Sequence, residues 1–293
     1  MPSNQNNAAR RYEKQYVGML ETVFSVNHSF SRALAPIQIK DGVQENEEAF
    51  SVKTNSTPVV VNDTYLKGVN DVMGDGSGKK SRFGDITEVK YTNTPVKYDY
   101  ELTIHEGIDR YTVNNNLDAA VADRFKLQTE AQVLGMNTRV GKHLDTVAGK
   151  SLALADFSEE KLKKLFNDMR TYYVNLGVRV PIVAYIRPEV LNALVDMTST
   201  NTSKGSTVSM DDNGLQKYKG FILEETPAQD FPTGTIGIFS PDAVTIPFVG
   251  ISTARVIEAE DFDGVKLQAA GKGGTFTLDD NKKAIGKITG TVV

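Results

Sequence analysis

The stretch Val96-Lys-Tyr-Asp-Tyr-Glu-Leu-Thr-Ile-His105 begins a region in which a strand pattern changes into a helical one. Every second residue of it is apolar or aromatic, so one face of a strand should enter a core while the other faces water or a partner. Asn114, Asn115 and Asn116 then offer helix N-caps. The apolar residues that share one broad face of the following helix are Leu117, Ala120, Val121, Phe125, Leu127, Ala131 and Leu134.

This helix is expected over about residues 116–148, and a helix of roughly 30 residues is about 45 Å long at the usual rise per residue. Since that length exceeds the width of most small domains, we interpret the helix as the spine of an elongated subunit. Three apolar residues drift off its apolar face: Met136, Val140 and Leu144. We therefore expect a kink or an early end at Gly135 or Gly141.

The composition excludes several functional classes. The chain has 293 residues, 40% of them hydrophobic, which is enough for one large or two modest cores. Its net charge of −4 arises from mixed acidic and basic residues, so there is no overall electrostatic footprint for nucleic-acid binding. The absence of cysteine excludes disulfides, zinc–thiolate sites and thiol nucleophiles. Without a secretory or membrane-spanning apolar run, we expect a soluble, unprocessed protein.

The residues before the deciding stretch have the pattern of an arm followed by a long hairpin. Ala8–Phe24 carries Tyr12, Tyr16, Met19, Leu20 and Val23 at helical spacings, which predicts a short amphipathic helix. Alternation and β-branched residues then predict short strands around Phe50–Thr54, Val59–Val61 and Ile86–Tyr91. The glycine-rich, charged segment Asn70–Ser81 should form the mobile hairpin tip. Because an isolated hairpin is marginally stable in water, we expect it to lie against a neighbouring subunit.

The residues after the spine helix predict a compact α/β lobe over 155–247. A capped helix should end before Gly177, and Pro188 should begin a second, shorter helix. The expected strands are 182–186, 220–225 and 234–239, with an exposed loop over 198–213. Strand patterning returns in the tail from Ile251 to Val293, and its last strand is expected over 284–292.

The sequence His105-Glu106-Gly107-Ile108-Asp109 resembles part of a zinc-protease motif. That chemistry needs two histidines one turn apart on a helix, but here the second position is Asp109, and Gly107 disfavours a helix. We therefore interpret the segment as a polar strand end. A metal-dependent hydrolase using His105, Glu106 and Asp109 is retained as a distant alternative that stoichiometric zinc would revive.

Two ligand-binding loop motifs fail in the glycine-rich segment. A phosphate loop ending at Gly78-Lys79 would need a glycine where Met73 stands and a Ser or Thr where Lys80 stands. A calcium loop starting at Asp71 would place Met73 and Arg82 where oxygen ligands are required. We expect no metal site, no cofactor and no catalytic residues in this chain.

Charged residues instead indicate contacts between subunits. The densest acidic run consists of Glu258, Glu260, Asp261 and Asp263, which are expected to meet lysine or arginine across a subunit contact. Basic residues of the hairpin assigned to the same role are Lys67, Lys79, Lys80 and Arg82.

The order of these parts, and three local sequences, resemble one family. Ile182-Val-Ala-Tyr-Ile-Arg-Pro-Glu189 is similar to its strand followed by a proline-led helix. Tyr218-Lys-Gly-Phe-Ile-Leu-Glu-Glu-Thr-Pro227, followed by Gly234-Thr-Ile-Gly-Ile-Phe239, is similar to its glycine-initiated strands. The chain resembles the major capsid proteins of tailed phages, which have the Hong Kong-ninety-seven-like fold.

The resemblance implies an α+β architecture with four parts. Residues 1–45 would be the N-terminal arm and 46–95 the extended β-hairpin loop. Residues 96–154 and 248–293 would form the peripheral domain with the spine helix, and 155–247 the axial domain. The family implies hexamers and pentamers that close into an icosahedral shell around double-stranded DNA.

The resemblance also implies partners and a location. Because no long segment precedes the arm, we expect a separate scaffolding protein, together with a portal protein, and assembly in the host cytoplasm into the virion capsid. Subunits of some members are joined by a Lys–Asn bond, but no matching asparagine and acid can be assigned here. The main alternative is a nanocompartment shell of the same fold that encloses an enzyme. A secreted adhesin or binding module is less favoured, since no signal sequence is visible.

Overall fold

The structure is a computed structural model that describes residues 29–39, 48–55, 57–61, 63, 65, 67, 82–83, 86–113, 116–197, 208–211 and 214–291. The helix expected over Ala8–Phe24 and the hairpin tip expected over Asn70–Ser81 lie outside these residues. The chain divides into two compact units, of which one is Asn46–Lys97 and the other comprises the residues before and after it. Each unit is described by itself.

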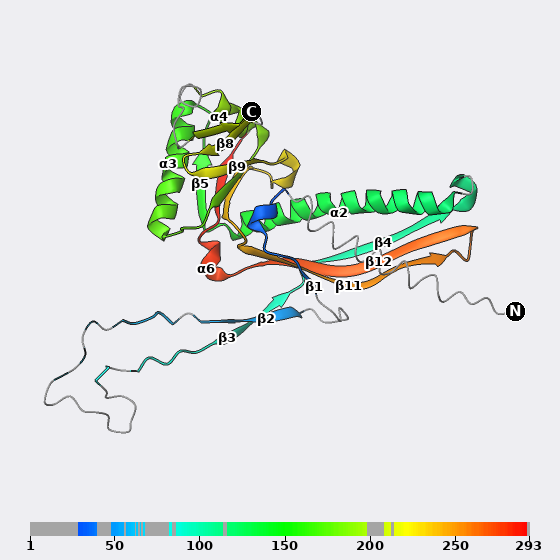
Figure 1. Ribbon diagram of the computed structural model, residues 1–293, viewed down its shortest axis with the longest axis horizontal. Coiled ribbons are helices and arrows are strands. Elements are labelled where there is room, and N and C mark those ends of the chain that lie inside the picture. Colours follow the sequence, from blue (N-terminus) through cyan, green and yellow to red (C-terminus); the bar gives the residue numbers. More distant parts are fainter. Residues whose placement is uncertain are drawn as a thin grey trace. The chain divides into compact units, whose positions relative to one another are not determined.

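The larger unit contains a long four-stranded sheet (Figure 1). Its strand order is β1 (Gln38–Ile39), β11 (Thr245–Glu258), β12 (Gly264–Thr277) and β4 (Tyr100–Asp109). β11, β12 and β4 pair in antiparallel fashion, while β1 is parallel to β11 and covers only two of its residues. From Tyr100 onward, β4 alternates between more buried and more exposed residues, as predicted. Asp99, just before the strand, is also bonded to β12: its backbone N–H donates to the Gly273 carbonyl and its carboxylate accepts from the Thr275 N–H.

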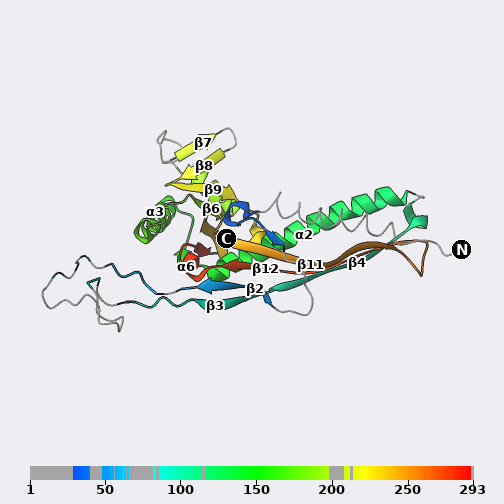
Figure 2. The same cartoon turned by 60° about the horizontal axis from the view of Figure 1, so that its bottom comes forward.

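The helix expected over 116–148 is α2 (Leu117–Val147), which follows the 3-10 turn η2 (Arg110–Val113) and lies along this sheet (Figures 1 and 2). Its first half packs Val121 and Phe125 against Leu267 and Ala269 of the sheet. Its second half contributes to a different cluster, in which Val140 and Leu144 pack with Tyr185 and Ile238. One helix therefore belongs to two cores.

This double packing corrects the predicted apolar face. Leu127 and Leu134 are 53% and 52% exposed, whereas the three residues expected off the face are buried: Met136, Val140 and Leu144. Along α2 the buried residues recur mostly every fourth position, as in the series Gln128, Gln132, Met136, Val140 and Leu144. Since four residues are more than one helical turn, the buried face rotates around the helix between the two cores.

Neither glycine ends α2, contrary to the expectation. Gly141 instead permits close packing, because a Cβ atom there would collide with the backbone carbonyl of Asp230. That carbonyl belongs to the 3-10 turn η3 (Ala228–Asp230).

A second, seven-stranded sheet forms the lobe. Its strand order is β5 (Lys150–Leu154), β13 (Gly286–Gly290), β10 (Thr235–Pro241), β6 (Ile182–Ile186), β9 (Phe221–Glu225), β8 (Gly214–Tyr218) and β7 (Val208–Asp211). The helices α3 (Glu159–Leu176) and α4 (Pro188–Val195) pack on the face that carries Ala184 and Ile186. The opposite face, which carries Tyr185, contacts the end of α2 and the turn η1 (Ser31–Ala33).

The lobe confirms several sequence predictions and corrects others. Gly177 ends α3 with a positive φ of 74°, and Pro188 begins α4. The loop expected over 198–213 contains β7. Residues 150–154 and 286–290 were expected with the spine helix, but their strands belong to the seven-stranded sheet. The tail turn before β13 is the short helix α6 (Asp279–Lys282).

The smaller unit is a two-stranded antiparallel pair of β2 (Glu48–Thr54) and β3 (Thr92–Lys97). The predicted strands at Val59–Val61 and Ile86–Tyr91 are wrong, because neither segment pairs with another within the described residues. β-branched residues favour an extended backbone, but a strand also needs a partner and a packed face. The single strand expected from Val96 to His105 is likewise divided, between β3 and β4.

Candidate functional site

Outside its paired strands β2 and β3, the smaller unit exposes many large apolar side chains to solvent. We call these residues the hairpin apolar surface: Val59, Val60, Val61, Tyr65, Phe83, Ile86, Val89 and Tyr91. Val59 is 89% exposed and Phe83 is 77% exposed, although the Phe83 ring contacts Tyr65 with a centroid separation of 5.3 Å. Clustered exposed apolar side chains mark interaction sites. This surface is therefore a candidate contact for another protein chain.

Of the basic residues predicted for contacts, the structure describes Lys67 and Arg82, while Lys79 and Lys80 lie outside the described residues. Lys67 and Arg82 both belong to the unit that carries the hairpin apolar surface. The Nε atom of Arg82 is shielded from solvent without a hydrogen-bond partner.

The predicted acidic run lies at the turn between β11 and β12. Asp261 pairs with Lys266 at 2.7 Å, and Asp263 pairs with Arg110 at 3.3 Å. The hydrogen bond from Lys266 lowers the pKa of Asp261. Glu258 ends β11, and Glu260 follows it on the surface. At least Asp261 and Asp263 thus have partners within their own chain, and the run as a contact between subunits remains a prediction.

The zinc-protease-like segment lies on β4, where adjacent side chains point to opposite faces. Glu106 faces α2 and accepts two hydrogen bonds from Arg124, at 2.7 and 2.6 Å, and one from Gln128 at 2.5 Å. These bonds, led by the one from Arg124, lower the pKa of Glu106. His105 points away from α2, so the segment does not converge on a metal. Within the described residues, no cluster of acidic residues and histidines could hold one.

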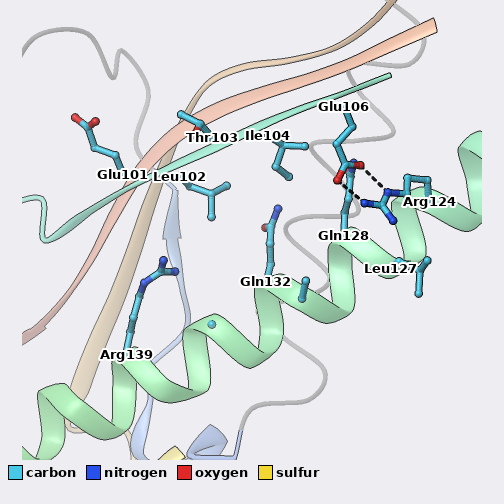
Figure 3. A pocket seen from close by; sticks show the side chains of 12 residues that line it. Glu101, Leu102, Thr103, Ile104, Glu106, Arg124, Leu127, Gln128, Gln132 and Arg139 are labelled. Atoms are coloured by element: carbon cyan, nitrogen blue, oxygen red, sulfur yellow. Dashed lines mark hydrogen bonds and ion pairs between the residues drawn. The ribbon is translucent and has the colours of Figure 1, made fainter. Parts of the chain in front are cut away.

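A groove of about 480 Å³ separates α2 from β4 (Figure 3). Its walls come only from these two elements, and β4 is the edge strand of the sheet among the described residues. The groove therefore runs beside an open strand edge. Gln132 points from α2 toward β4 between Leu102 and Ile104, and its buried Nε2 atom has no hydrogen-bond partner. A buried, unsatisfied donor is costly, which makes this groove a candidate binding site.

An aromatic clamp, formed by Tyr100 with Met136 and Arg139, joins β4 to α2. The Tyr100 hydroxyl donates to the sulfur of Met136 at 2.9 Å, and the Arg139 guanidinium lies 4.2 Å from the centre of the Tyr100 ring. Burial raises the pKa of Tyr100 to about 12, so this hydroxyl stays protonated at neutral pH. The clamp fixes β4 to α2.

Sequence reasoning missed the groove. Gln128 and Gln132 are buried on α2, but polar residues are normally assigned to the exposed face of a helix. A signal was present, since Gln128 and Gln132 follow Phe125 by three and seven residues, which places all three on one face of a helix.

No family model and no curated protein sequence matches the chain. Solved structures do. The mature capsid of bacteriophage PhiM1 matches with a TM-score of 0.61 at 12% identity, over 92% of this chain and 88% of that one. The capsid structure of the cyanophage P-SCSP1u matches with a TM-score of 0.57 at 12% identity, over 88% and 87%.

The chain has the Hong Kong-ninety-seven-like capsid fold. A virus-like particle from Pyrococcus furiosus also shares this capsid fold, with a TM-score of 0.51 at 13% identity over 94% of this chain and 98% of that one. Because all these identities are low, the likeness establishes the architecture alone. Among the described helices of this capsid fold, none is both long and apolar enough to cross a membrane.

Proposed function

We propose that the chain is the major capsid protein of a tailed double-stranded DNA phage. Its copies would assemble into hexamers and pentamers of an icosahedral shell that encloses the genome. The hairpin apolar surface carries this proposal, because a two-stranded hairpin with exposed apolar side chains is marginal in water by itself. The capsid fold supports the same function, and it points to a structural protein and not to an enzyme.

The energetics favour a second copy of the chain as the cover of this surface. Each large apolar side chain contributes about 1.5–3 kcal/mol when it is fully buried. Association costs about 4–15 kcal/mol. Burial of the hairpin apolar surface therefore drives association only when most of its side chains are buried together. A shell supplies such contacts repeatedly, since every subunit both covers a neighbour and is covered.

The parts of the fold take distinct roles in this proposal. The lobe built on the seven-stranded sheet, mainly residues 155–247, would be the axial domain that meets other copies at the five-fold and quasi-six-fold axes. The four-stranded sheet and α2 would form the peripheral domain, and 46–95 the extended loop. Separate scaffolding and portal proteins would guide assembly in the host cytoplasm.

Electron microscopy of the full-length chain after expression tests the proposal. Closed shells of uniform diameter are expected. A solution of monomers at high concentration, with no shells under any assembly condition, would contradict the proposal.

A nanocompartment shell is the second candidate. The likeness to the virus-like particle from Pyrococcus furiosus supports it, since that chain shares the fold over 98% of its length. A nuclease-protection measurement on particles from their native source separates the two. Protected double-stranded DNA of uniform length supports the phage capsid, whereas particles that hold protein and no DNA support the nanocompartment.

A further inference from the structure

A stripe of small and apolar residues remains exposed along α2. It consists of Leu127, Ala131, Leu134 and Thr138, which recur at intervals of four, three and four residues. Leu127 and Leu134 are each about half exposed, at 53% and 52%. Leu127 and Ala131 also form part of the groove beside β4. Alternating intervals of three and four residues are the pattern of a seam between two packed helices.

The N-terminal residues outside the described part of the chain carry a matching stripe. The sequence predicts an amphipathic helix over residues 8–24. Within it, Tyr12, Tyr16, Met19 and Val23 recur at the same intervals of four, three and four residues. Helices with matching heptad stripes can pack side by side along their whole common length.

The first described residue, Ser29, is bonded to α2. The backbone N–H of Ser29 donates to Asn137 at 3.2 Å, and Asn137 donates back to the Ser29 hydroxyl at 3.1 Å. That hydroxyl donates in turn to Asp230 at 2.6 Å. Ser29 therefore lies against Asn137, at the end of the α2 stripe.

The lengths also agree. A helix over residues 8–24 is about 25 Å long, and the stripe from Leu127 to Thr138 spans about 17 Å. Residues 25–28 remain as a connection to Ser29. Because both the segment and the stripe approach Asn137 with increasing residue number, the two helices would run parallel.

We propose that residues 8–24 bind as a helix along the α2 stripe of their own chain, over the mouth of the groove. Met19 would lie against Leu134, and Tyr16 against Ala131. A tyrosine of the segment can pack its ring on the stripe and offer its phenolic oxygen to the unsatisfied amide of Gln132. This docking goes beyond the proposed shell function, since it concerns how one subunit completes its own surface.

A disulfide pair tests the docking in the full-length chain. The natural sequence has no cysteine, so Met19→Cys combined with Leu134→Cys introduces only the intended pair. Under mild oxidation we expect a disulfide within one chain, identified by peptide mass. The matched control combines Met19→Cys with Lys126→Cys, an exposed position on the same helix but off the stripe. The stripe pair should form roughly tenfold faster, because docking raises the effective concentration of its thiols.

The outcomes separate the alternatives. Equal rates for the two pairs would overturn the docking. A disulfide found only between two chains would overturn binding within one chain, because the segment would then belong to another copy.

Hydrogen exchange provides a second test that needs no covalent bond. Changing Leu127 and Leu134 together to lysine should accelerate exchange of the peptide spanning residues 8–24 severalfold. The matched control changes Val174 and Val180 to lysine, since these valines are 67% and 52% exposed on the lobe. The control should leave the peptide unchanged. Full exchange of this peptide in the unaltered chain, or equal effects of both double variants, would overturn the proposal.

Discussion

At the scale of single residues, Gly141 and Gly135 lie on the same helix but have opposite packing constraints. A Cβ atom at Gly141 would collide with the backbone carbonyl of Asp230, which cannot move as a flexible side chain could. A Cβ atom at Gly135 would meet only the end of the Arg139 side chain, at 3.6 Å. Sequence alone classified both glycines as possible breaks, because the close approach to Asp230 depends on tertiary structure.

Alanine substitutions should therefore have opposite effects at these two glycines. Gly141→Ala is expected to lower the free energy of unfolding by roughly 1–3 kcal/mol through overpacking. Gly135→Ala should raise it by about 0.4–1 kcal/mol, because alanine favours helix and restricts the unfolded chain. Chemical denaturation of the two variants measures both changes. A similar loss of stability in both would show that α2 does not pack on η3 as described.

Glu224 should make stability depend on pH. Burial raises its pKa to about 7, and Asp242 raises it further while Arg32 opposes the shift. A carboxyl group with a raised pKa binds its proton more tightly in the folded state. Its contribution to stability is therefore complete below its unfolded pKa of about 4.5 and is lost as the pH rises through about 7.

The variant Glu224→Gln should melt at a higher temperature than the natural chain at about pH 8, because its amide resembles the protonated acid. The difference should vanish at about pH 4.5, where the natural side chain keeps its proton. Thermal melting across this range gives the comparison. Glu225→Gln serves as the control, since Glu225 is exposed on the same strand. A difference independent of pH would contradict the assignment to Glu224.

At the scale of elements, local signals predicted those parts whose boundaries depend on neighbouring residues. Proline at the start of α4 and glycine after α3 act on the adjacent backbone, and both helices form where they were expected. The pairing of β5 with β13 joins residues far apart in the chain, which no local pattern encodes. Only the first half of the buried face of α2 was predicted, because the buried face rotates where the helix passes from one core to another. The groove was missed for the same reason.

The buried half of the predicted face can be tested on α2. Phe125 is only 8% exposed and packs against the four-stranded sheet, so Phe125→Asp places a charge in an apolar core. We expect a loss of at least about 3 kcal/mol in the free energy of unfolding. Lys126→Asp introduces the same side chain at an exposed neighbouring position and should change stability much less. Equal denaturation midpoints for the two variants would show that this part of the helix faces elsewhere.

At the scale of the whole molecule, folding and assembly should depend on different parts of the chain. The three hydrophobic clusters of the larger unit contain none of the residues of the hairpin apolar surface. Deleting Thr64–Thr87 removes Tyr65, Phe83 and Ile86 but retains both β2 and β3. We expect a soluble subunit whose melting temperature equals that of the full chain, and whose micrographs show no closed shells.

A variant of natural length tests whether assembly depends on the apolar side chains of the hairpin or only on its length. Changing Val59, Val60 and Val61 together to lysine keeps every residue of the hairpin unit but replaces three exposed apolar side chains with charges. Because the proposed contact depends on burying those side chains, this variant should also fold and also fail to close shells. Normal particles from the lysine variant would mean that the hairpin apolar surface is not the contact. Normal particles from the deletion would remove the hairpin unit from assembly altogether.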